Sequence, residues 1–135
     1  MTCLVLLALA AAAGGQPDSM RVEIVVPSRV AVGAPVPITL RIANTAERPI
    51  ELHLQGRTIV FDLTVRRGAA VVWRRLEGES VPAILQIRML APGEVLELKE
   101  TWDQQVGPGD YSVSGEIPTD GAPLRAGPVP LTISG

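Results

Sequence analysis

The sequence has few of the side chains on which most enzymes and metal proteins depend. Its 135 residues include one cysteine, Cys3, and one histidine, His53. A transition-metal site needs several such ligands that converge, so the composition argues against one. The same shortage argues against a cysteine nucleophile or a Ser-His-Asp triad, and no G-x-S-x-G segment is present. We therefore predict no metal, no cofactor and no enzyme activity.

The chain also lacks a large excess of charge of either sign. Twelve basic and fourteen acidic residues leave a formal net charge of −2, and Lys99 is the only lysine. Such a balance creates no field strong enough to hold polyphosphate. Nucleic acid is therefore excluded as an expected partner.

Aromatic residues number only four and are dispersed along the chain: Phe61, Trp73, Trp102 and Tyr111. A platform for sugars or single-stranded nucleic acid would need several rings on one exposed face, so we interpret these rings as core anchors. Phe61 and Trp73 are expected in the core, and Trp102 at the end of a strand. The Tyr111 hydroxyl is expected to bond to nearby backbone, as in a tyrosine corner.

The first fifteen residues are typical of a secretory signal. Leu4 to Ala13 is an unbroken apolar run that is too short for a bilayer, and Ala11-Ala12-Ala13 supplies a cleavage site. Met1-Thr2 lacks the usual basic residue. We expect residues 1–15 to be a signal peptide and the protein to be exported, to the periplasm or outside the cell. The mature chain would then contain no cysteine and no stable membrane anchor.

Residues 20–135 show the alternation of apolar and polar side chains that is typical of β-strands. Turn signals recur every 8–12 residues or so, and no helical periodicity persists. We predict a single all-β domain, an immunoglobulin-like antiparallel β-sandwich of about seven to nine strands. Residues 27–36 and Pro118 to Pro128 are predicted to be turn-rich connections. The predicted strands cover residues 21–26, 37–44, 50–54, 59–65, 71–73, 84–90, 95–102, 111–117 and 129–133.

A series of short landmarks extends from about Ile38 to Glu116. They are Asn44-Thr45 with Pro49, Phe61-Asp62, Val72-Trp73-Arg74, Leu90-Ala91-Pro92-Gly93-Glu94, Glu100-Thr101-Trp102 and Pro108-Gly109-Asp110-Tyr111. In order and spacing the series resembles the BsuPI family of intracellular proteinase inhibitors. The resemblance implies an immunoglobulin-like sandwich that binds a protein, in the founding type a serine protease. Since this chain looks like an exported member, the word "intracellular" does not transfer to it.

Three loops are the candidate contact regions: residues 55–58, 77–82 and 118–128. Rigid Pro/Gly loops lower the ordering cost of binding, which favours the last of them. The alternative is that such loops only join strands and protect edges. The predicted partner-binding residues are Arg57, Pro118, Asp120, Leu124 and Arg125.

Two functions remain open at this stage. The domain either inhibits an extracytoplasmic serine protease through a loop, or serves as an adhesion or scaffold module of the cell envelope that docks by a sheet face or edge. His53 is expected to face solvent, with Glu51 on the opposite face of its strand. The arginine pairs Arg66-Arg67 and Arg74-Arg75 are expected to pair with carboxylates at the surface.

Overall fold

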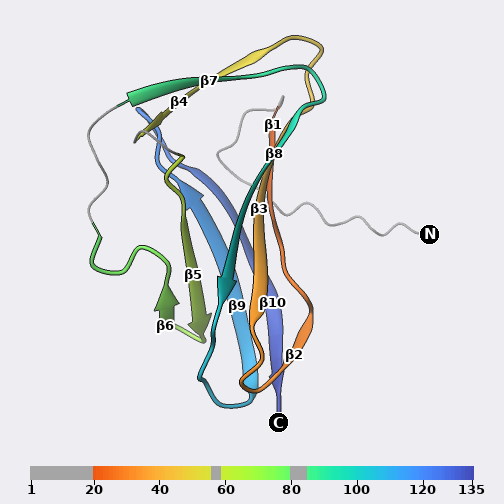
Figure 1. Cartoon of the computed structure of the whole chain (residues 1–135), viewed down its shortest axis with the longest axis vertical. Helices are drawn as coiled ribbons and strands as arrows, with labels where there is room; N and C mark the ends of the chain where they lie inside the picture. The colour runs from red at the N-terminus through yellow and green to blue at the C-terminus, as the bar shows by residue number, and fades with distance from the viewer. Residues whose placement is uncertain (1–19, 56–58, 80–84) are drawn as a thin grey trace, which may run out of the picture.

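The computed structural model describes residues 20–55, 59–79 and 85–135, and these form ten strands and no helix (Figure 1). The strands are β1 (Met20–Val25), β2 (Arg29–Ala31), β3 (Val36–Asn44), β4 (Ile50–Gln55), β5 (Asp62–Arg67), β6 (Ala70–Arg74), β7 (Leu85–Leu90), β8 (Val95–Trp102), β9 (Gly109–Ile117) and β10 (Leu124–Ser134). The sequence predicts nine strands, and the additional strand is the short β2, which lies in the stretch expected to be a connection. No helix among the described residues is long and apolar enough to cross a membrane.

Two sheets pack face to face. One has the order β1-β3-β8, and the other has the order β2-β10-β9-β5-β6. All their pairings are antiparallel except that of β2 with β10, which is parallel. The predicted all-β sandwich is confirmed. Strands β4 and β7 form a separate two-stranded sheet that lies across one end of the sandwich (Figure 1).

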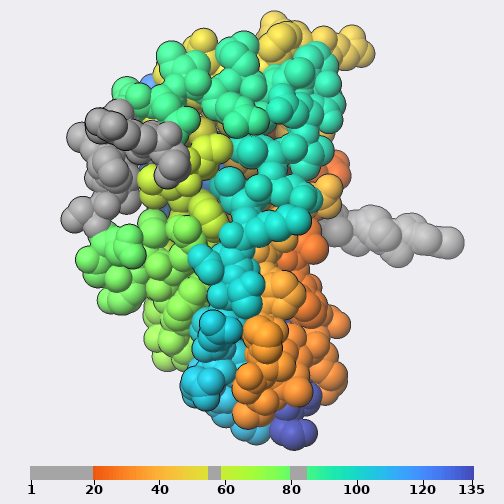
Figure 2. All heavy atoms as spheres, in the orientation of Figure 1, coloured from red at the N-terminus to blue at the C-terminus, as the bar shows by residue number. Residues whose placement is uncertain are grey.

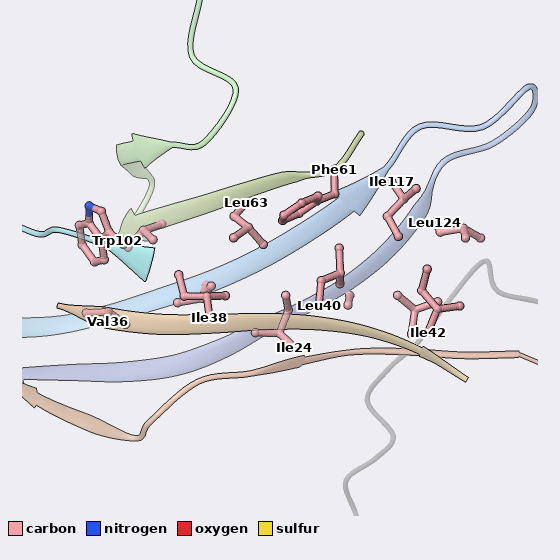
Figure 3. Packing of buried hydrophobic residues seen from close by; sticks show 14 of the residues in the cluster. Ile24, Val36, Ile38, Leu40, Ile42, Phe61, Leu63, Trp102, Ile117 and Leu124 are labelled. Atoms are coloured by element: carbon pink, nitrogen blue, oxygen red, sulfur yellow. The ribbon is translucent and has the colours of Figure 1, made fainter. Parts of the chain in front are cut away.

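The core follows directly from the predicted alternation. In β3 every second residue from Val36 to Asn44 is buried, and the same period holds from Tyr111 to Ile117 in β9. Figure 3 shows the side chains of β1 and β3 pointing toward those of β5, β9 and β10. At Gly115 the sheets approach so closely that a Cβ atom would lie 2.8 Å from Cδ1 of Ile24.

The aromatic rings depart from the prediction at one position. Trp102 is buried at 4% exposure, whereas Trp73 is only half-buried and stacks on it, with the ring centroids 5.6 Å apart. Trp73 lies on β6, which is an edge strand among the described residues, so on one side it has no neighbouring strand there to cover it. Phe61 is in the core as predicted, and the Tyr111 hydroxyl donates to the Gly107 carbonyl at 2.7 Å.

Two of the four arginines in the predicted pairs have carboxylate partners. The Arg74 guanidinium donates to Asp62, with Nε 3.2 Å from Oδ2. Arg75 Nε lies 2.9 Å from Glu100 Oε1, and its guanidinium lies 3.8 Å from the centre of the Phe61 ring. Arg75 directly follows β6 of one sheet, and Glu100 lies on β8 of the other. This ion pair therefore links the two sheets.

The predicted loop from Pro118 to Pro128 is wrong in its second half. Leu124 and Ala126 are buried and pair with β9, so the loop ends at Pro123. The register shifts between Ala126 and Val129, which accommodates Gly127 and Pro128 as a bulge. Proline is tolerated here because β2 pairs with β10 only from Thr132 onward, and this side of the strand needs no N–H donor.

Candidate functional site

The pair of β4 and β7, which we call the arm, is held to the sandwich by apolar side chains of its inner face. Leu52 and Leu54 of β4 and Leu90 of β7 are buried, at 5%, 0% and 0% exposure. Leu54 also forms a β-bridge with Thr119, which lies between β9 and β10. The arm is thus part of the packed structure rather than a free hairpin.

Asn44 fixes the point where both arm strands meet the sandwich. Its residue exposure is 1%, and its Nδ2 donates to the carbonyls of Arg48 and Leu90, both at 2.9 Å. Its Oδ1 accepts from the Ala46 amide at 2.8 Å. Arg48 comes just before β4, and Leu90 ends β7. One buried amide therefore positions the start of one arm strand and the end of the other.

The loop between β9 and β10, residues 118–123, is fixed to the edge of β4 that faces away from β7. The Asp120 amide donates to the His53 carbonyl at 3.2 Å. Within the loop, Thr119 Oγ1 donates to the Ala122 carbonyl at 2.9 Å and accepts from the Gly121 amide at 3.0 Å. The loop is therefore ordered before any partner arrives.

His53 connects this loop to the outer face of the arm. Its Nδ1 lies 2.9 Å from Asp120 Oδ2, and its Nε2 lies 2.7 Å from Glu51 Oε1. The hydrogen bond to Glu51, followed by that to Asp120, raises the pKa of His53 above its ordinary 6.5. Only the imidazolium can donate to both carboxylates at once.

The prediction that His53 and Glu51 lie on opposite faces was wrong. Residues two apart in a strand share a face, because the side-chain period is two. The structure places both on the outer face of β4. His53 is 38% exposed in its side chain, so it does meet solvent as expected, although between two carboxylates.

The outer face of β7 is an exposed apolar row formed by Leu85, Ile87 and Met89, which are 54%, 62% and 50% exposed. Ile87 pairs with His53 across the arm, and Met89 pairs with Glu51. The space-filling view shows β7 (green) at the surface of the upper end of the molecule (Figure 2). An apolar row and an acidic cluster thus lie side by side on one face.

The predicted contact residues lie in different environments. Arg57 lies outside the described residues, as do residues 80–82 of the second candidate loop. Pro118 is half-buried and Asp120 is exposed. Leu124 is 7% exposed and belongs to the core, so it offers no surface to a partner. Arg125 is exposed and its Nε lies 3.2 Å from Glu116 Oε1.

A cation site is not apparent in the described ranges. No group of three or more histidine, cysteine, aspartate or glutamate side chains there is arranged to hold a metal ion. The Glu51, His53 and Asp120 side chains bond to one another instead of converging on a common point. The cluster is therefore suited to holding a loop and presenting negative charge.

The family model BsuPI, described as intracellular proteinase inhibitor, matches residues 22–121. No match was found among curated proteins. Among solved structures, the C-terminal domain of wzt is 13% identical, with a TM-score of 0.55 over 87% of this chain and 74% of that chain.

Two further structures fit less well. The CARDB domain of the PF1109 protein from Pyrococcus furiosus is 14% identical, with a TM-score of 0.46 over 85% of both chains. The β-glucosidase EmGH1 from Erythrobacter marinus is 14% identical, with a TM-score of 0.47, and this chain covers 15% of its length. At 13% identity the wzt domain bears on the fold alone.

Proposed function

The chain belongs to the BsuPI family of intracellular proteinase inhibitors, and from this membership we propose that it inhibits a serine protease outside the cytoplasm. It does so as a non-catalytic domain that binds the enzyme. Export is supported by the apolar, uncharged run from Leu4 to Ala13.

The observation that carries this proposal is the fixed loop of residues 118–123. An inhibitor that inserts a loop into a protease gains affinity when the loop is ordered in advance, because less conformational entropy is lost on binding. Asp120 fixes the loop twice, by its backbone amide and by its carboxylate. The loop also projects from the same end as the arm, so a protease can contact both.

The test is a stoichiometric inhibition assay with the purified chain against a panel of subtilisin-like and trypsin-like serine proteases. We expect at least one protease to be blocked at an equimolar ratio, with the inhibitor left intact. Replacing residues 119–123 by an Asn-Gly turn should weaken that inhibition by about tenfold or more, which corresponds to about 1.4 kcal/mol, an effect that loss of one central contact residue can produce.

The control is Val32→Thr in the β2–β3 turn, which lies at the opposite end of the sandwich (Figure 1). Val32 is 45% exposed, so its replacement tests for unspecific surface effects. Equal inhibition by the loop variant and the parent would remove the loop from the proposal. Failure to slow any protease would favour the second candidate, an adhesion or scaffold module of the cell envelope, for which the exposed row on β7 is the supporting observation.

A further inference from the structure

The outer face of edge strand β7 carries neither charge nor proline, and its one charged residue, Arg88, points to the inner face and lies 3.4 Å from Glu94. Among the described residues β7 pairs only with β4, so the backbone groups on its other side have no strand partner. Edge strands usually carry charge or proline at outward positions to block pairing with another chain. Edge strand β8 follows this rule with Glu97 and Lys99, whereas the outer face of β7 presents Leu85, Ile87 and Met89.

We propose that β7 binds an extended segment of a partner protein, which adds to the arm as a third strand. The segment has apolar side chains at alternate positions and a lysine or arginine on the same face. This inference does not depend on protease inhibition.

The partner segment needs apolar side chains because of its pairing with β7. An added strand places its outward side chains about 5 Å from those of β7, within contact of Ile87 and its neighbours. The three half-exposed side chains together offer on the order of 300 Å² of apolar surface, which falls within the range of functional patches. Backbone hydrogen bonds along the open edge supply the rest of the affinity.

The partner segment needs a lysine or arginine because acidic side chains lie beside the apolar row of β7. Glu51 lies opposite Met89, and Asp120 lies on the other side of His53. The two carboxylates and the imidazole together carry a charge of −1 or −2, according to the protonation of His53. An added strand lies about 10 Å from β4, two strand spacings away, which an arginine and a glutamate side chain bridge together. Met89 between them is unbranched and adapts to such a contact.

A second copy of this chain fits the surface less well. Its β7 would bring apolar side chains but no basic group at the described outward positions, so it would not offset the net negative charge of Glu51, His53 and Asp120. The area is also small, because a stable interface needs roughly 1,000 Å² or more in total. The segment of a partner is therefore the preferred occupant.

The test is a titration of the ¹⁵N-labelled full chain, followed by NMR, with three blocked seven-residue peptides that alternate threonine and valine and have threonine at both ends, so that the central residue shares a face with the valines. One peptide has a central arginine, one has glutamate at that place, and one is the arginine peptide methylated at alternate backbone nitrogens. We expect the arginine peptide to shift the amide signals of β7 and to bind about fivefold or more tightly than either of the others.

Two variants and a control locate the contact. Ile87→Thr should weaken binding of the arginine peptide by about fivefold or more, through loss of apolar contact. Glu51→Gln should reduce the preference for arginine over glutamate. Val71→Thr is the matched control, because Val71 is 48% exposed on β6, another edge strand. Unchanged urea midpoints will show that these surface variants remain folded.

Several results would overturn the inference. They are equal binding of the arginine and methylated peptides, absence of β7 shifts at millimolar peptide, and a β7-dependent dimer of the parent chain. A gain of peptide binding on removal of residues 1–15 would assign the surface to the chain's own leader and also refute it. Loss of protease inhibition in the loop variant, while the arginine peptide still shifts the β7 amide signals, would separate the two proposals.

Discussion

Asn44 offers the most direct test of how the arm is held, through the substitution Asn44→Ala. The change removes three hydrogen bonds, two donated by Nδ2 and one accepted by Oδ1. The Leu90 carbonyl is buried, and leaving such a group unsatisfied costs about 1–3 kcal/mol. The Arg48 carbonyl and the Ala46 amide are only partly buried, so water can replace part of each bond, at about 0.5–1 kcal/mol apiece. We expect a loss of about 2–5 kcal/mol in the free energy of unfolding.

Urea denaturation followed by tryptophan fluorescence measures this loss, because small single domains usually unfold in one step. Thr45→Ala is the control, since Thr45 is the exposed neighbour in the same turn and should change stability by less than about 0.5 kcal/mol. Asn44→Asp keeps the acceptor for Ala46 but loses both donors, so it should be at least as unstable as Asn44→Ala at neutral pH.

Hydrogen exchange distinguishes a local effect from a general one. If Asn44 positions the arm, the amides of β4 and β7 should lose more protection than those of β3 and β9. An unfolding free energy within about 0.5 kcal/mol of the parent would show that water replaces all three bonds and would refute the reasoning. Uniformly faster exchange would show that Asn44 supports the whole sandwich instead.

Two further predictions concern the tryptophans and the histidine. Trp102→Ala should cost about 3–5 kcal/mol and Trp73→Ala about 1–3 kcal/mol, because only the former ring is fully buried, and the reverse order of urea midpoints would contradict this. Because the pKa of His53 is raised in the fold, its contribution to stability should be complete below pH 6.5 and disappear as the pH rises through the folded pKa. NMR titration of the ring should show a pKa above 6.5 that falls in Glu51→Gln, and a pKa at or below 6.5 in the parent would refute the double hydrogen bond.

The sandwich was predictable because its core strands alternate strictly. Ile38, Leu40 and Ile42 fall on one face in the sequence and are all buried in the structure. A period of two fixes which residues share a face, but it does not fix how much of that face is covered. For this reason the sequence overestimates the burial of Trp73 on edge strand β6, whereas Trp102, at the end of β8 in the other sheet, is the buried ring.

The candidate site was less accessible to sequence reasoning. Asp120 was among the predicted contact residues, but its bond to His53 joins positions 67 residues apart, which no local pattern reveals. The sequence predicts Leu124 in a loop because Pro118 to Pro128 is rich in proline and glycine, although a bulge lets β10 continue through Gly127 and Pro128. The exposed row on β7 is a further example. Alternation places Leu85, Ile87 and Met89 together, but the fold decides that no layer of the described residues covers them.

The loop of residues 118–123 and β7 lie on opposite edges of β4. The two proposed contacts share His53, which bonds to Asp120 in the loop and to Glu51 beside β7. A cation bound by Glu51 weakens the attraction of Glu51 for His53, and the imidazolium then binds Asp120 alone. Such coupling is reciprocal, because a partner that takes Asp120 away from His53 must equally change the affinity at Glu51. A double-mutant cycle with Glu51→Gln and Asp120→Asn, read out as binding of the arginine peptide, measures it. If the changes in binding free energy of the two single variants add up to that of the double variant, the two contacts act independently. If His53 couples them, we expect the double variant to show a smaller change than this sum.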